Sequence, residues 1–262
     1  MRHRAKLAAG SPCRPARWLV GGAWLVLSLG FSAPAAAAKI KGRLDNWRLL
    51  TNPVWDEYKD PKKHGYSFRE VVPTVRADVR RLFPHIPKEL CIAAIGTTKQ
   101  KPPPPVLIRV GGGRTTPVTL VVPPGTQLQF QNTDPFNHRL YGVGIASFAP
   151  NDTIKGGVRG WTVPGPGVSE FRDALAPSLR MWVIGEPNVA GIAYPSMKGE
   201  FQLTLTEPGD YTIQAFFSGK KVGPAKLVKF EGGDIDITRD PIKVVADAKK
   251  KADQKKKEEE KK

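Results

Sequence analysis

The sequence predicts an all-β protein, a Greek-key β-sandwich with further short strands beside it. The chain of 262 residues contains 25 prolines and 26 glycines, which suit short strands joined by turns better than helices. Short stretches that are continuously apolar, or that alternate between apolar and polar residues, follow one another after residue 105. The turns between them are too frequent for parallel βαβ units, which favours a sandwich.

The individual strands are predicted from these patterns. In 127–132, Leu128 and Phe130 alternate with glutamines, so one face of the strand is apolar. In 199–217 we expect a hairpin, because two alternating segments flank the turn sequence Glu-Pro-Gly-Asp. Apolar runs predict three more strands: 106–110, 118–122 and 179–184.

Residues 1–38 have the three-part layout of a secretory signal peptide. A basic segment is followed by an apolar one, 18–31, which is too short to span a bilayer comfortably, and then by small residues. We place cleavage after Ala38, and Ala35 or Ala37 would also serve. The alternative is an uncleaved membrane anchor. Cleavage predicts an extracytoplasmic protein, periplasmic or secreted, with no transmembrane segment left.

The segment 39–105 is predicted to be a mixed N-terminal region. Its first residues, KIKGRL, are compatible with a strand, and apolar spacing in 74–83 predicts a short amphipathic helix that ends at Pro84. The prolines of 101–105 form a stiff linker to the strands that follow.

The other end of the chain, 241–262, is predicted to be a charged tail. From about residue 246 it has no apolar stripe, so we expect it to be solvated and disordered, or to tether the protein to an anionic surface.

The chain is basic, with a formal net charge of +17 at pH 7. Without leader and tail, the body keeps a diffuse excess of roughly +9. This charge favours anionic neighbours such as lipid head groups, acidic polysaccharide or nucleic acid, or it serves solubility alone. No motif predicts specific nucleic-acid recognition.

Two cysteines are present, and Cys13 lies in the leader. Cys91 would therefore be alone in the mature chain, without an internal disulfide. Its apolar surroundings, LCIAAI, predict a buried thiol; a free thiol or one paired with another chain are the alternatives.

The segment VTLVVPPGTQLQFQNTDPFNHRLYG resembles the first half of a cupredoxin, and the resemblance extends over 106–185. It implies that His138 occupies the position of a copper-binding histidine. In the second half, FRDALAPSLRMWV resembles the loop that carries the other ligands. Asp173 then stands in the cysteine position, Ala176 in the histidine position and Leu179 in the methionine position.

A blue-copper site needs two imidazoles and a thiolate, often with a weak axial methionine. The mature chain has His64, His85 and His138, and neither Cys nor His follows residue 138. We therefore expect no copper and no other cofactor, and a vestigial site at His138, Asp173, Ala176 and Leu179. The alternative for His138 is a polar residue at a loop edge, hydrogen-bonded to backbone.

Residues 186–240 resemble the carboxypeptidase regulatory domain, a small transthyretin-like sandwich. The resemblance is carried by a Gly-x-Phe strand and a Pro-Gly-x-Tyr turn, at Gly199, Phe201, Pro208, Gly209 and Tyr211. The early KIKGRL resembles the first strand of that module. This module has no catalytic residues.

No catalytic motif is apparent, since the sequence has no Gly-x-Ser-x-Gly elbow, phosphate-binding loop or closely spaced histidine pair. The predicted function is a non-enzymatic, exported cell-envelope binding or structural protein. Its partner would be an envelope protein or an anionic envelope polymer. The long loops of 142–170, with Phe148 and Trp161 exposed, form the candidate binding surface; alternatively Trp161 caps the sandwich end. The alternative function is a copper-binding periplasmic electron-transfer protein.

Overall fold

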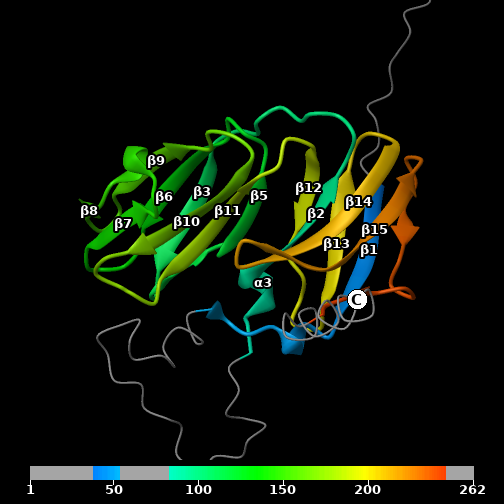
Figure 1. The fold of residues 1–262 in the computed structure, drawn as a ribbon, viewed down its shortest axis with the longest axis horizontal. Helices are drawn as coiled ribbons and strands as arrows, with labels where there is room; N and C mark the ends of the chain where they lie inside the picture. The colour runs from blue at the N-terminus through cyan, green and yellow to red at the C-terminus, as the bar shows by residue number, and fades with distance from the viewer. Residues whose placement is uncertain (1–37, 54–82, 246–262) are drawn as a thin grey trace, which may run out of the picture. The chain divides into compact units, whose positions relative to one another are not determined.

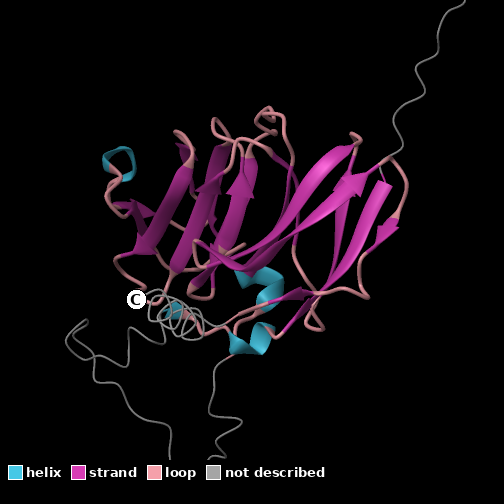
Figure 2. Cartoon of the chain, turned by 45° about the vertical axis from the view of Figure 1, so that its right-hand side comes forward, coloured by secondary structure: helices cyan, strands magenta, loops and turns pink. Residues whose placement is uncertain are grey.

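The computed structural model describes residues 38–53 and 83–245, and in this part of the chain it is almost entirely β. The strands form four sheets, which face one another in two pairs and make two sandwiches (Figures 1 and 2). The all-β sandwich prediction is therefore confirmed. Helical structure in the described residues is short, such as the single turn α3, Ile86–Glu89.

The first sandwich is built from strands at both ends of the described chain, and we call it the framing sandwich. One of its sheets has the order β13-β1-β16, with β17 also paired to β1, and the other has the order β12-β2-β14-β15. The bounds of these strands are β1 Ala38–Asp45, β2 Leu90–Ile95, β12 Val189–Ala193, β13 Glu200–Leu205, β14 Gly209–Phe217, β15 Lys220–Phe230, β16 Ile235–Asp236 and β17 Ile242–Lys243.

The second sandwich lies between β2 and β12 in the sequence, and we call it the inserted sandwich. Its two sheets have the orders β5-β11-β10-β7-β8 and β4-β3-β6-β9. The bounds are β3 Val106–Gly111, β4 Arg114–Thr116, β5 Thr119–Val122, β6 Gln127–Asn132, β7 His138–Gly142, β8 Asn151–Thr153, β9 Val158–Thr162, β10 Gly167–Asp173 and β11 Arg180–Gly185.

Each sandwich has its own core, and β2 joins the two. Alternate residues of β2, Leu90, Ile92 and Ala94, lie in the core of the framing sandwich. Cys91 and Ala93 point the other way, into a smaller cluster that includes residues of β5 and β11. Because β2 is buried on both faces, it reads as a continuous apolar run. The predicted burial of Cys91 is confirmed.

Two hydrogen bonds at Thr119 of β5 reinforce this junction. The hydroxyl of Thr119 donates to the backbone carbonyl of Glu89 at 2.6 Å, and the hydroxyl of Tyr194 donates to the carbonyl of Thr119 at 3.0 Å.

The early strand β1 runs beside the late strand β13, as Figure 1 shows by its blue strand among yellow and orange ones. Gly42 of β1 stands opposite Phe201 of β13, and a Cβ at Gly42 would lie 2.3 Å from the phenyl ring. The glycine of KIKGRL thus makes room for the aromatic ring of Gly-x-Phe. The strands drawn from 39–105 and from 186–240 consequently share the same two sheets.

The expected hairpin in 199–217 is wrong in its pairing. Its two arms, β13 and β14, lie in different sheets, since β13 pairs with β1 whereas β14 pairs with β2 and β15. Their apolar side chains still face one core from opposite sides. The alternation of apolar and polar residues shows which side chains of a strand point inward, but it does not show which strand is the hydrogen-bonded partner. Two consecutive strands in facing sheets therefore have the same sequence pattern as the two strands of a hairpin.

Several predictions fall at or beyond the limits of the described residues. The predicted helix 74–83 lies outside them except for Phe83, as do leader residues 1–37 and tail residues 246–262. Ala38 is the buried first residue of β1 and pairs with Leu205; cleavage after Ala35 or Ala37 would retain it. Ile242 and Val244, within the predicted tail, pack in the framing core.

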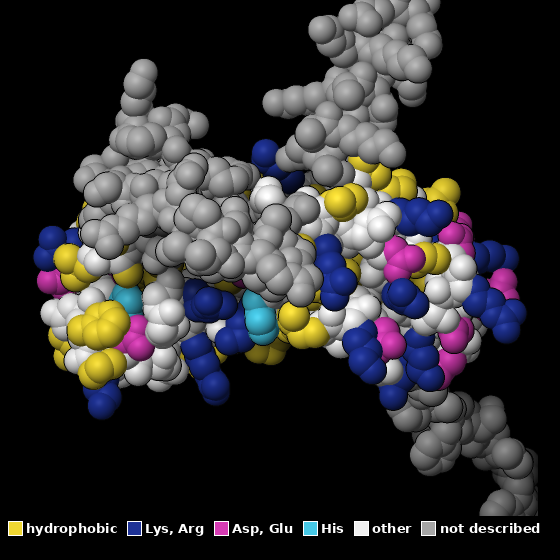
Figure 3. Space-filling model, turned by 90° about the horizontal axis from the view of Figure 1, so that it is seen from below, with side chains coloured by type: hydrophobic (Ala, Val, Ile, Leu, Met, Phe, Trp, Pro, Cys, Tyr) yellow, Lys and Arg dark blue, Asp and Glu magenta, His cyan; other side chains and the backbone are white. Residues whose placement is uncertain are grey.

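Among the described residues, no helix has the length and hydropathy needed to cross a membrane. Basic side chains are spread over the face drawn in Figure 3, interspersed with acidic, apolar and uncharged side chains.

Candidate functional site: an Asp–His–Asp cluster

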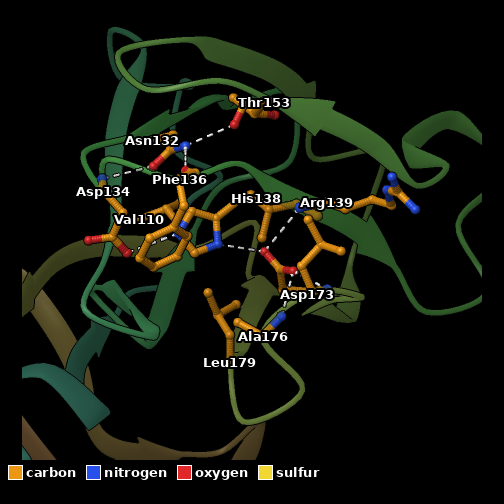
Figure 4. A network of polar contacts seen from close by, with 12 residues as sticks. Val110, Asn132, Asp134, Phe136, His138, Arg139, Thr153, Asp173, Ala176 and Leu179 are labelled. Atoms are coloured by element: carbon orange, nitrogen blue, oxygen red, sulfur yellow. Dashed lines mark hydrogen bonds and ion pairs between the residues drawn. The ribbon is translucent and has the colours of Figure 1, made fainter.

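His138 begins β7 at one end of the inserted sandwich, and its side chain is fully buried. Its Nδ1 lies 2.7 Å from Oδ2 of Asp173, and its Nε2 lies 3.0 Å from Oδ2 of Asp134. Figure 4 shows the imidazole ring between the two carboxylates. The cupredoxin resemblance aligned His138 and Asp173 with two ligand positions, and the structure brings these two side chains into contact. The alternative of a loop-edge histidine bonded to backbone is wrong, because both partners are side chains.

Asp173 is the last residue of β10, and its buried carboxylate organises the loop that follows. Oδ1 accepts the backbone N–H groups of Leu175 at 2.6 Å and Ala176 at 2.9 Å. Oδ2 accepts the N–H of Arg139 at 3.2 Å in addition to the imidazole contact. The carboxylate therefore ties β7, β10 and the loop after β10 together.

Asp134 lies in the turn between β6 and β7. Both of its carboxylate oxygens lie within 3.0 Å of the backbone nitrogen of Gly112, in the turn between β3 and β4. This N–H group, and secondly the imidazole of His138, hold the pKa of Asp134 below its usual value. Asp134 thus connects the histidine to the opposite sheet.

Asn132, the last residue of β6, shapes the turn that carries Asp134. Its amide nitrogen donates to the carbonyls of Phe136 and Thr153, each at 2.8 Å, and its oxygen accepts the N–H of Asp134 at 2.8 Å. The ring of Phe136 lies against His138, with centroids 5.2 Å apart, and is 54% exposed.

The partners determine which hydrogen bonds the imidazole makes. An ionised carboxylate only accepts hydrogen bonds, and Asp173 already accepts three backbone N–H groups. Each ring nitrogen of His138 therefore has a carboxylate neighbour within hydrogen-bond distance, and the side chain has no exposed surface.

The other two predicted positions lie beside this cluster and supply no ligand atoms. Ala176 packs against the core of the inserted sandwich, and Leu179 is completely buried in it. With a carboxylate, a methyl group and an isobutyl group at the three loop positions, the donor set does not fit a blue-copper centre. Within residues 38–53 and 83–245, no cluster of three or more His, Cys, Asp or Glu residues has the arrangement of a metal site.

Phe148 and Trp161 are not the exposed side chains that the sequence suggested. Phe148 is 1% exposed and Trp161 is 6% exposed, and both contact Phe171 in the core of the inserted sandwich. The long loop folds back onto the sandwich because Arg159 holds it. Recognition through the loops of 142–170 remains a prediction, and it would have to use other side chains.

Sequence reasoning missed Asp134 and Asn132. The sequence Asn-Thr-Asp-Pro carries a usable signal, since Asn and Asp favour turns in which their side chains bind backbone groups. The contact between Gly112 and Asp134 could not be predicted from the local sequence, because the two residues are 22 positions apart. His85 precedes α3, far along the chain from this cluster, and His64 lies outside the described residues.

No protein-family model matches this chain, and no curated protein matches it in sequence. The solved structures that it resembles include a purple cupredoxin from Nitrosopumilus maritimus, at 17% identity and a TM-score of 0.27, over 30% of this chain and 98% of the other. A reduced amicyanin mutant matches at 15% identity and a TM-score of 0.29, over 36% of this chain and 99% of the other.

The copper-containing nitrite reductase from Thermus scotoductus matches at 22% identity and a TM-score of 0.28, over 35% of this chain and 24% of the other. By name, one of these three structural neighbours is a cupredoxin and another contains copper, and each likeness spans about a third of the chain.

Proposed function

We propose that this chain is an exported, non-catalytic cell-envelope protein whose inserted sandwich is a cupredoxin-like scaffold without copper. The observation that carries the proposal is the pairing of both ring nitrogens of buried His138 with carboxylates. In a copper protein, one of these nitrogens would bind the metal. Here the hydrogen bond from His138 to Asp173 connects the two strands that a metal would otherwise link.

The same geometry supports the non-enzymatic part of the proposal. A general base needs a ring nitrogen that can reach a substrate proton. His138 has no exposed surface, and its Nε2 faces Asp134. The cluster therefore serves to hold three segments together.

We further infer that the framing sandwich is of the carboxypeptidase regulatory type. The pairing of β1 with β13 supports this, because KIKGRL and Gly-x-Phe were the two segments that resembled strands of that module. The hydroxyl group of Tyr211, in the Pro-Gly-x-Tyr turn, donates a hydrogen bond to the backbone carbonyl of Glu207 at 2.7 Å and fixes the turn. In this role the framing sandwich is an accessory module.

Metal analysis of the purified mature protein tests the copper part of the proposal. After incubation with Cu(II) or Cu(I) and desalting, we expect well below one copper per chain and no thiolate-to-copper absorption band. About one tightly bound copper per chain would instead favour the electron-transfer alternative.

A gain-of-function variant tests the alignment itself. The triple variant Asp173→Cys, Ala176→His, Leu179→Met should bind copper and turn blue, because removal of the Asp173 carboxylate frees Nδ1 of His138, which faces position 173. The matched control adds His138→Ala to the triple variant and should lose the colour. A triple variant that folds without binding copper would contradict the alignment.

Export is tested separately by cell fractionation and N-terminal sequencing. We expect the chain outside the cytoplasm, with its N-terminus between residues 36 and 39. Exported protein that keeps Met1 would contradict the cleavage prediction.

A further inference from the structure

In the part of the chain that the structure describes, one outward sheet face of the inserted sandwich has two arginines as its only charged side chains. The sheet β4-β3-β6-β9 buries alternate residues in the core, and its other residues point outward. We call this outward surface the glutamine face. It consists of Leu107, Arg109, Arg114, Thr116, Gln127, Gln129, Gln131, Val158, Gly160 and Thr162.

The strand register arranges these residues in rows. Gln129 lies between Leu107 on β3 and Gly160 on β9, and the next row places Gln131 between Arg109 and Val158. Residues two apart on a strand are about 6.6 Å from each other, so the three glutamines form a line of amides about 13 Å long. Aliphatic side chains flank that line on both sides.

The charge on this face differs from the charge on the opposite sheet. The four strands β3, β4, β6 and β9 contain no Asp or Glu. Arg109 and Arg114 are exposed, and neither forms an ion pair within the described part of the chain. On the opposite sheet, by contrast, Arg139 pairs with Asp152 and Arg172 pairs with Glu170.

We propose that the glutamine face binds an acidic polysaccharide. A glutamine amide both donates and accepts hydrogen bonds, as a sugar hydroxyl does, and a guanidinium binds a carboxylate with two parallel hydrogen bonds. Leu107 and Val158 supply apolar contacts for the C–H faces of the sugar rings. This proposal rests on the proposed function in one respect, since a protein in the cell envelope would meet acidic polysaccharides there.

Two other anionic partners fit the face less well. Single-stranded nucleic acid is bound by aromatic stacking together with a basic groove, and the glutamine face has no aromatic side chain. An anionic lipid surface is recognised by clusters of four or more Lys or Arg residues, whereas this face has two arginines. Neither partner would use a line of neutral amides.

Binding of the mature protein to polygalacturonate, measured by affinity electrophoresis and calorimetry, tests the proposal. Neutral dextran, an oligonucleotide and anionic vesicles serve as comparison probes. We expect binding to polygalacturonate that weakens with added salt, and about tenfold weaker binding when Arg109→Gln and Arg114→Gln are combined, on the order expected for two exposed ion pairs.

A second variant acts on the same face without removing any side chain. Gly160→Glu adds a carboxylate in the row of Gln129, where a Cβ meets nothing nearer than the Leu128 carbonyl oxygen at 3.9 Å. It should weaken binding as strongly as the double variant. Lys221→Glu, on β15 of the framing sandwich, makes a larger charge change than either arginine substitution and should leave binding unchanged. Melting temperatures confirm that each variant folds.

Three outcomes would overturn the proposal: no binding to polygalacturonate, equal weakening by Lys221→Glu, or tighter binding of vesicles or oligonucleotide that the same variants abolish. These outcomes are separable from a failure of the proposed function. If the protein is not exported, it should still bind polygalacturonate in vitro. If it does not bind polygalacturonate, the cell fractionation still decides whether it is exported.

Discussion

At the scale of single residues, the Asp–His–Asp cluster shows how a buried polar side chain is accommodated. Burying an imidazole without partners is costly, and His138 avoids that cost by contacting a carboxylate at each nitrogen. Asp173 in turn has hydrogen-bond donors at both oxygens. Removal of any member leaves a buried partner unsatisfied, so the cluster should behave as one unit.

Asp173→Ala should lower the free energy of unfolding by about 3–5 kcal/mol, because it leaves three backbone N–H groups and a buried imidazole without their acceptor. Urea denaturation measures this change. Asp152→Ala is the matched control, since it removes an exposed carboxylate that pairs with Arg139. The control should be much less destabilising; equal losses would contradict a special role for the cluster.

The carboxylate of Asp134 should make the free energy of unfolding depend on pH. Its pKa is lowered from the usual 3.8 by the N–H of Gly112 and by His138, so in acid the unfolded chain binds more protons at this residue than the folded one. Its contribution is therefore present above pH 3.8 and is lost as the pH falls through the lower folded value.

Asp134→Asn should lose less stability than the wild type on acidification, and thermal unfolding as a function of pH measures the difference. An NMR titration of the Gly112 amide would report the folded pKa directly. A titration midpoint at or above 3.8 would contradict the lowering.

At the scale of elements, Arg159 of β9 explains how a glycine-rich loop becomes part of the core. Its Nη1 donates to the carbonyls of Leu140 at 2.7 Å and Asn151 at 3.1 Å, and Nη2 donates to that of Ala149 at 2.9 Å. The guanidinium carbon lies 4.1 Å from the ring centroid of Phe148. One side chain thus fixes both ends of the segment that carries Phe148.

Arg159→Ala should therefore destabilise the protein by about 2–4 kcal/mol and expose Phe148. Thermal unfolding measures the loss, and hydrogen exchange in residues 142–151 should accelerate locally. Arg109→Ala, in the same sheet but on the glutamine face, should change neither. If Arg159→Ala left exchange in this loop unchanged, the loop would be held by other contacts.

Strand positions were readable from the sequence, whereas pairing and exposure were not. Alternation at Leu128 and Phe130 correctly gave the inward face of β6. Alternation in β13 and β14 also gave the inward faces, yet it could not reveal that these strands lie in different sheets. Phe148 and Trp161 looked exposed because glycines and polar residues surround them, and only the fold places Arg159 and Phe171 against them.

The candidate site was predicted in the same partial way. Resemblance to a known ligand loop paired Asp173 with His138 across 35 positions of sequence. Asp134 contacts the same ring from only four positions away, but its role depends on Gly112, which the pairing of β3 with β6 places beside it. Local sequence cannot report contacts that strand pairing creates.

At the scale of the whole molecule, the junction between the two sandwiches contains Cys91. Burial raises the pKa of its thiol to about 12. Since the thiolate is the reactive form, native mature protein, in which Cys91 is the single cysteine, should resist labelling by a disulfide reagent at pH 8. In urea, labelling should appear together with loss of tryptophan fluorescence, because β2 is exposed only when the sandwiches part. Rapid labelling of the native protein would contradict a closed junction.

The place of β1 and β2 also constrains the order in which the molecule can be assembled. Residues 96–188 separate the end of β2 from the start of β12, its partner strand. Likewise, β1 cannot pair until β13 has been synthesised. During synthesis from the N-terminus, the alternating strand β1 and the continuously apolar strand β2 therefore leave the ribosome well before their partner strands. All strands of the inserted sandwich lie between β2 and β12 in the sequence, so this sandwich is complete before the last strands of the framing sandwich are synthesised. Until the C-terminal strands are synthesised, the unpaired backbone edges of β1 and β2 are open to pairing with other chains, and a chaperone that binds extended segments would protect them during synthesis.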